Sequence, residues 1–111
     1  MIPSQHELSV SNSLQALAAS KEPFLSLLEH GSLVVEIYKP DKVDHQTPHT
    51  RDEVYVVTSG SGWFVNGEVR HRFEPGQLLF VPAGVVHRFE DFTDDFSTWV
   101  LFYGPEGGER A

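Results

Sequence analysis

The sequence predicts an all-β protein in which short strands form a sandwich or a barrel. Eight short stretches rich in Val, Leu, Ile, Phe, Tyr and Trp follow Phe24, and Gly, Pro, Asn or Asp separates most of them. Such spacing is typical of sandwiches and barrels, whereas parallel sheets need helical crossovers between strands. Because 111 residues suffice for one core, we expect a single domain over residues 1–111.

The two ends of the chain differ from this strand-rich middle. Residues 11–20 are small and polar, and they predict one or two helical turns with Ser13 as the N-cap. We therefore expect an N-terminal extension with a short helical segment over residues 1–20. Residues 104–111 are rich in Gly and Glu and predict a flexible tail.

The predicted strands follow one another in short hairpins. Residues 24–28 and 32–38 flank His30-Gly31, where Gly can take the positive φ of a hairpin turn. Asn66-Gly67 predicts a second two-residue turn. The other strands are predicted at residues 54–60, 62–67, 69–75, 77–82, 85–92 and 96–104.

Composition and charge exclude several classes of protein. The net charge is −8, from sixteen acidic and eight basic residues, so we expect neither nucleic acid nor an anionic membrane as a partner. Cysteine is absent, which excludes disulfides, zinc-thiolate sites and thiol nucleophiles. No apolar run approaches the length of a membrane span, and the first residues do not resemble a signal peptide, so we expect a cytoplasmic protein.

Three residues form a candidate metal site. His49 and Glu53 stand four residues apart, and His87 follows a Pro-Ala-Gly turn. Two imidazoles and a carboxylate suit divalent first-row metals, and three protein ligands leave coordination positions open. A straight strand would separate His49 from Glu53 by about 13 Å. We therefore predict a bend at residues 50–52, with His49 ending one strand and Glu53 starting the next.

Strand alternation selects further candidates for the site. Tyr55 shares a face with Glu53, and an inward carboxylate at the start of such a strand is costly unless it is paired or bound to a cation. Phe89 shares a face with His87. We expect Tyr55, Phe89 and Trp99 to line a substrate pocket.

These residues resemble the two motifs of the cupin superfamily, G-x5-H-x-H-x3,4-E-x6-G and G-x5-P-x-G-x2-H-x3-N. His49, Glu53 and Gly60 match the second half of the first motif. The second motif is matched by Gly76, Pro82, Gly84 and His87, with Asp91 in place of the final Asn. The resemblance implies a double-stranded β-helix, that is, a jelly-roll barrel with a metal ion at its mouth.

One position departs from the pattern. The first histidine of the H-x-H pair should fall at residue 47, where this chain has Thr47. We favour His45, which a bulge could bring to the metal instead, with Gln46 as the alternative to it. Alternatively, the site has only its three protein ligands. These alternatives stay open at the level of sequence.

Cupins include enzymes, ligand binders, sensors and storage proteins, so the fold implies no single function. Our first hypothesis is a mononuclear, dioxygenase-like enzyme that holds Fe, Mn, Ni or Zn and acts on a small organic molecule. In it Glu53 serves as ligand and proton acceptor. Isomerase or lyase chemistry is an alternative, and a non-catalytic small-ligand binding or sensing domain is the second hypothesis. Similarity to single-domain cupins also implies a homodimer, in which residues 22–38 are suited to exchange between subunits.

Overall fold

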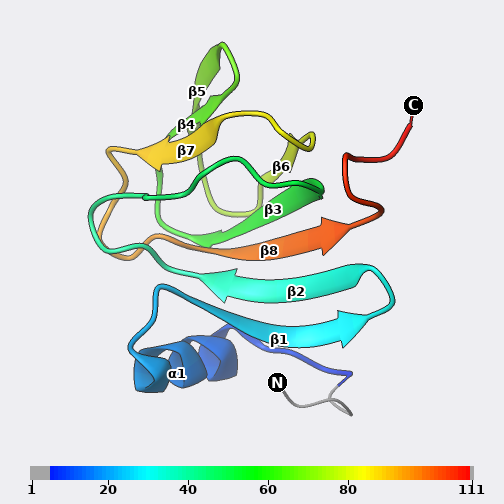
Figure 1. Ribbon diagram of the computed structural model, residues 1–111. Helices are drawn as coiled ribbons and strands as arrows, with labels where there is room; N and C mark the ends of the chain where they lie inside the picture. Colours follow the sequence, from blue (N-terminus) through cyan, green and yellow to red (C-terminus); the bar gives the residue numbers. More distant parts are fainter. Residues whose placement is uncertain (1–5, 111) are drawn as a thin grey trace.

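Two antiparallel sheets face each other in the computed structural model, which describes residues 6–110 (Figure 1). The larger sheet has the strand order β1-β2-β8-β3-β6, and the smaller has the order β5-β4-β7. This is the jelly-roll arrangement of a double-stranded β-helix, as the resemblance implies. The strands are β1 (Phe24–His30), β2 (Leu33–Tyr38), β3 (Asp52–Ser59), β4 (Gly62–Asn66), β5 (Val69–Phe73), β6 (Leu78–Val81), β7 (His87–Glu90) and β8 (Ser97–Tyr103).

Aromatic side chains fill the space between the two sheets. The ring of Phe89 lies at the centre, with its centroid 4.6 Å from that of Phe64, 4.5 Å from Phe96 and 4.9 Å from Tyr55. These separations are those at which aromatic pairs attract each other beyond simple burial. The core therefore packs against Tyr55, the residue two positions after Glu53 on β3.

The alternation predicted for β3 is confirmed. Tyr55 and Val57 are buried between the sheets, whereas Val54 and Val56 on the other face are half-buried. Each predicted strand has a counterpart in the structure. Period-two burial thus sets the direction in which Glu53 points.

Both predicted hairpin turns lie one residue later than expected. His30 pairs with Leu33, and Asn66 pairs with Val69, so each predicted first turn residue still belongs to a strand. The turns themselves begin at Gly31 and Gly67, whose φ angles are 58° and 62°. Only the glycine takes the left-handed conformation without strain, and the ladder closes just before it.

The N-terminal helix is longer than predicted and begins earlier. Helix α1 (Val10–Ser20) is capped by Ser9, whose hydroxyl accepts a hydrogen bond from the backbone N–H of Asn12 at 3.1 Å. The prediction of Ser13 as N-cap is wrong, because Ser13 is buried within the helix. The helix packs on β1 and β2 and buries Leu17. Packing of this kind stabilises a helix that has little propensity of its own.

The described part of the C-terminal tail lies against the start of β3. The backbone N–H of Gly107 donates to the Thr50 carbonyl, and that of Glu109 donates to Asp52 Oδ2, each at 2.7 Å. The flexibility of this tail stays a prediction. Residues 1–5 of the predicted extension and residue 111 of the tail lie outside the described residues. Within residues 6–110, no helix is long and apolar enough to cross a membrane.

Candidate metal centre

A loop brings the first candidate ligand to the sheet. Residues 39–51 connect β2 to β3 without forming a strand, so the prediction that His49 ends a strand is wrong. The carbonyl of His49 instead accepts a hydrogen bond from the N–H of Gly84 at 2.7 Å, which ties the loop to the turn before β7. The predicted bend before Glu53 is confirmed, since Thr50 and Arg51 form a bend and β3 begins at Asp52.

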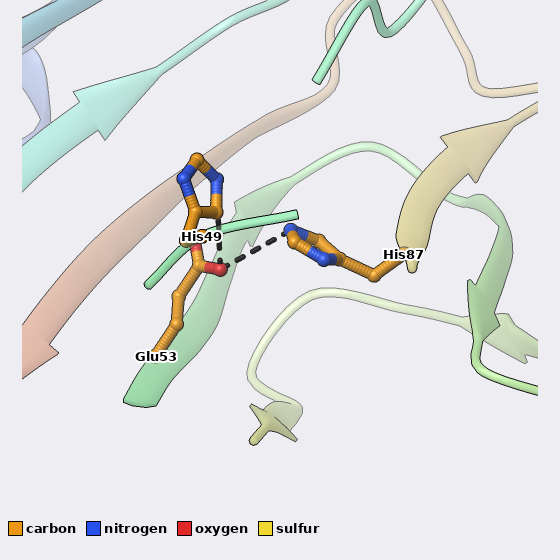
Figure 2. Close-up of side chains that lie close together, drawn as sticks. All are labelled: His49, Glu53 and His87. Carbon is orange, nitrogen blue, oxygen red and sulfur yellow. Dashed lines mark ion pairs between the residues drawn. The ribbon is translucent and has the colours of Figure 1, made fainter. Parts of the chain in front are cut away.

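The three candidate ligands converge, although they come from three parts of the fold. His49 lies in the loop, Glu53 on β3 of the larger sheet and His87 on β7 of the smaller sheet. Figure 2 shows their side chains pointing toward one another, with the Glu53 carboxylate between the two rings. Glu53 Oε1 lies 3.2 Å from His87 Nε2 and 3.8 Å from His49 Nε2. One ligand atom from each residue falls within 4.8 Å of the others, so one ion can contact all three.

The buried atoms of this cluster lack hydrogen-bond partners. Glu53 is 1% exposed, and neither of its carboxylate oxygens accepts a hydrogen bond from another described residue. His87 Nε2 is likewise buried and has no hydrogen-bond partner among the described residues, although it lies 3.2 Å from Glu53 Oε1. Orphaned buried polar atoms of this kind are costly, and a divalent cation would satisfy all three together. The donor set therefore fits a metal ion.

A contact with the backbone of Val85 orients the ring of His87 as a ligand. Its Nδ1 lies 2.9 Å from the Val85 carbonyl, which favours the tautomer with the proton on Nδ1 and leaves the Nε2 lone pair directed at Glu53. Burial lowers the pKa of His87, but the Glu53 carboxylate and the Val85 carbonyl outweigh burial, and the pKa is raised overall. Burial also lowers the pKa of His49, where it outweighs the attraction of Glu53.

Gln46 lies beside the cluster and is oriented by its neighbours. Its Oε1 accepts a hydrogen bond from the Tyr55 hydroxyl at 2.8 Å and lies 3.2 Å from His49 Nε2. Its Nε2 donates to Asp44 Oδ2 at 2.8 Å. Burial and the Glu53 charge raise the pKa of Tyr55 well above its usual value, so the phenol stays protonated and donates.

Asp44 is a functional residue that the sequence did not reveal. It is buried, and its carboxylate accepts hydrogen bonds from the Tyr38 hydroxyl, from the backbone and side-chain amides of Gln46, and from the Phe89 N–H. The bond to the Gln46 backbone spans two residues, as in an Asx-turn, and this local pattern was the only available signal. Asp44 thus anchors the loop to both sheets.

The structure separates the remaining candidates. His45 is exposed and lies outside the cluster formed by the three described ligands. Tyr55 reaches the site through Gln46, while Phe89 lies in the core behind Tyr55. Trp99 pairs with Val56, on the sheet face opposite to Glu53 and Tyr55. Asp91, in the last motif position, follows the end of β7, is exposed and pairs with Arg70 at 3.3 Å.

A cleft of about 590 Å³ opens beside the cluster. His49 and Gln46 line it, whereas Glu53 and His87 are buried and contact the cleft only through His49 and each other. Its other lining residues come from β1, β2, β8 and the loop over residues 39–47, together with the segment that leads into β1. A cleft of this size accommodates a small organic molecule.

Comparison with known proteins agrees with this fold. A protein 35% identical over 91 residues, the uncharacterized protein SCO3923 of Streptomyces coelicolor, spans 80% of this chain and 87% of its own length. A double-stranded beta-helix protein from Klebsiella pneumoniae has a TM-score of 0.67 at 19% identity, covering 89% of this chain and 90% of that one. A cupin superfamily protein from Desulfitobacterium hafniense gives 0.65 at 14% identity, covering 93% and 95%.

The family assignment rests on the sequence. The model described as "Cupin domain" (Cupin_2) matches residues 34–102. The match begins on β2, ends on β8 and includes His49, Glu53 and His87. Since this match covers more than half of the chain and its motif residues meet in one cluster, the protein belongs to the cupin family.

Proposed function

We propose that this protein holds one divalent metal ion through His49, Glu53 and His87 and acts as a dioxygenase-like enzyme on a small organic molecule in the adjacent cleft. The observation that carries the proposal is the set of three buried atoms without hydrogen-bond partners, Glu53 Oε1, Glu53 Oε2 and His87 Nε2, next to His49, which lines a cleft of about 590 Å³. A cluster built only for stability would satisfy its buried polar atoms internally.

The surroundings of the cluster indicate which part of the chemistry the metal ion would supply and which part Glu53 would supply. When bound, Fe, Mn, Ni or Zn supplies Lewis acidity and open coordination positions for a substrate, and Fe also supplies redox chemistry. Both Glu53 oxygens lack hydrogen-bond partners, so Glu53 has the capacity to hold the ion with one oxygen and accept a substrate proton with the other. The buried position of Glu53 keeps bulk water away from that proton.

Gln46 is our choice for the fourth position around the metal. Its Oε1 already lies 3.2 Å from His49 Nε2, and Tyr55 and Asp44 hold the amide in one orientation. His45 has no such contact and is exposed. A weak amide ligand also leaves the position open to exchange with substrate.

Metal content tests the site directly. We expect near-stoichiometric Fe, Mn, Ni or Zn by plasma mass spectrometry, none in His87→Ala, and less in Glu53→Gln, which keeps the size of the side chain but loses its charge. His71→Ala is the matched control, because His71 lies on β5 outside the cluster. Unchanged metal content in both site variants would show that the ion is bound elsewhere.

Oxygen consumption tests the reaction. Protein reconstituted with Fe(II) should consume O₂ with a small enol, diketone or phenolic compound, and Glu53→Gln should abolish the turnover. Isomerisation or cleavage of a compound without O₂ uptake would assign the site to an isomerase or lyase. A compound that raises the Tm saturably and is recovered unaltered would instead support a binding or sensing domain.

A further inference from the structure

The inner face of the larger sheet carries a second carboxylate, Glu36 on β2. In the ladder, Glu36 pairs with Val100 on β8, and Val100 pairs with Tyr55 on β3, so the three residues form one row across neighbouring strands (Figure 1). Two steps between strands place the Cα of Glu36 about 10 Å from that of Tyr55. Tyr55 in turn contacts Gln46 beside the metal cluster.

The carboxylate of Glu36 is half-buried and lacks a cationic partner. Its Oε2 accepts a hydrogen bond from the Ser26 hydroxyl at 3.1 Å. None of the ion pairs formed by residues 6–110 includes Glu36. Burial raises its pKa, the Ser26 hydroxyl opposes that shift, and the charges of Glu53 and Glu29 add to it. An additional hydrogen-bond donor would stabilise a half-buried carboxylate that has no cationic partner.

Glu36 and one candidate ligand of the metal cluster, His49, line the same cleft. His49 and Gln46 line one part of its wall, and Glu36 lines another. The lining also includes apolar side chains from β1, β8 and the loop after β2, namely Phe24, Val43, Val100 and Phe102. One ligand in the cleft can therefore contact the candidate metal site, the apolar side chains and the Glu36 carboxylate.

We propose that Glu36 selects the substrate of this site: a small molecule with a metal-ligating end, an apolar middle and a hydroxyl or ammonium donor that Glu36 accepts. The inference rests on the proposed function, because it needs the ion at the other end. Two lysines also line the cleft, but they do not neutralise Glu36. Lys21 is exposed, and Lys39 Nζ donates to the Asp94 carbonyl at 2.5 Å. A ligand with an anionic far end would meet Glu36 as a like charge.

Four catechols that differ only at the far end test this selection. Calorimetry on the full chain loaded with Zn²⁺ avoids oxidation of the ligand, and the metal content is measured after each titration. The 4-(2-aminoethyl), 4-(2-hydroxyethyl), 4-ethyl and 4-(2-carboxyethyl) catechols share the metal-binding end. We expect the amine and the alcohol to bind about tenfold more tightly than the ethyl compound, and the carboxylate to bind most weakly.

Glu36→Gln is the informative variant, since glutamine keeps the volume and an acceptor for Ser26. It should remove the preference for the amine while leaving the affinity for 4-ethylcatechol unchanged. Glu22→Gln is the matched control, because Glu22 is an exposed carboxylate that lines the same cleft. This control should keep the preference.

Three results would overturn the inference while the metal site stands. They are equal affinities for the four catechols, a preference for the amine that survives Glu36→Gln, and a Zn²⁺-loaded protein that binds none of the catechols. A protein that retains no metal after loading would refute the proposed function, and this inference with it. The metal content of each sample therefore separates the two kinds of failure.

Discussion

Asp44 determines how the loop over residues 39–51 sits on the barrel. Its two carboxylate oxygens receive four hydrogen bonds of 2.6–3.0 Å, from Tyr38 on the larger sheet, Phe89 on the smaller sheet and Gln46 in the loop itself. The same carboxylate thus binds both sheets and Gln46. The position of Gln46 relative to the sheets therefore depends on Asp44.

Asp44→Asn should therefore destabilise the protein more than its small chemical change suggests. The amide nitrogen would face donors that need an acceptor, and we expect a loss of about 2–4 kcal/mol in the free energy of unfolding, measured by urea denaturation. Asp94→Asn is the control, because Asp94 is exposed, and it should change stability by less than about 0.5 kcal/mol. Equal stabilities of the two variants would contradict the role of Asp44.

The two histidines predict how metal binding depends on pH. The pKa of His87 is raised, so in the metal-free protein its protonated form contributes stability below the ordinary pKa near 6.5 and this contribution is lost as pH rises through the raised pKa. The pKa of His49 is lowered, so its neutral form contributes stability above the ordinary pKa and loses it as pH falls through the lowered pKa. Metal binding needs both rings neutral.

Metal affinity should consequently fall as pH decreases through the raised pKa of His87, before His49 titrates. We expect the affinity for Zn²⁺, measured by chelator competition between pH 8 and 5.5, to drop about tenfold per pH unit once His87 is protonated. Calorimetry in buffers of different ionisation enthalpy should show proton release near neutral pH. An affinity that is constant down to pH 6 would argue against His87 as a ligand.

At the scale of elements, the motif glycines act in different ways. Gly60, between β3 and β4, has a φ of 79°, and a Cβ there would lie 2.4 Å from the Cα of Phe96. Gly76, before β6, has a similar φ of 86° but meets nothing within 4 Å. Gly60 is needed because its φ is positive and because a side chain there would clash with Phe96. Gly76 is needed only because its φ is positive.

Substitution of each of these two glycines by alanine should separate the cost of the positive φ from the cost of the clash with Phe96. Gly76→Ala should cost about 1–2 kcal/mol from the left-handed backbone alone. Gly60→Ala should cost a further 1–3 kcal/mol or so, because the backbone of Phe96 must shift. Thermal and urea unfolding of both variants measures the difference, and equal losses would show that the contact with Phe96 relaxes without cost.

For the whole molecule, a metal ion would join the two sheets. Glu53 belongs to the larger sheet and His87 to the smaller, so an ion bound to both links them across the core. Since the ion binds the folded site, a concentration one hundred times the Kd adds about 2.7 kcal/mol, or about 10 °C in Tm. Chelator should reverse the rise, and His87→Ala should not show it; a rise of equal size in that variant would place the ion elsewhere.

The sequence also predicts a homodimer, and this prediction is tested on the whole molecule. Light scattering of the purified protein should give about 25 kDa, twice the 12.5 kDa of one chain. A mass of one chain at micromolar concentration would contradict the prediction.

The sequence predicts the fold class, the positions of the strands and the three residues that converge in the candidate metal cluster. Alternating apolar residues identify the buried face of each strand. His49, Glu53 and His87 lie next to local turns, and proline and glycine indicate such turns in the sequence. The bonds from Asp44 to Tyr38 and Phe89, the contact of α1 with β1 and β2, and the position of Glu36 in the cleft become visible only in the tertiary structure. They depend on contacts between different elements of the fold, which the sequence pattern of any one element does not encode.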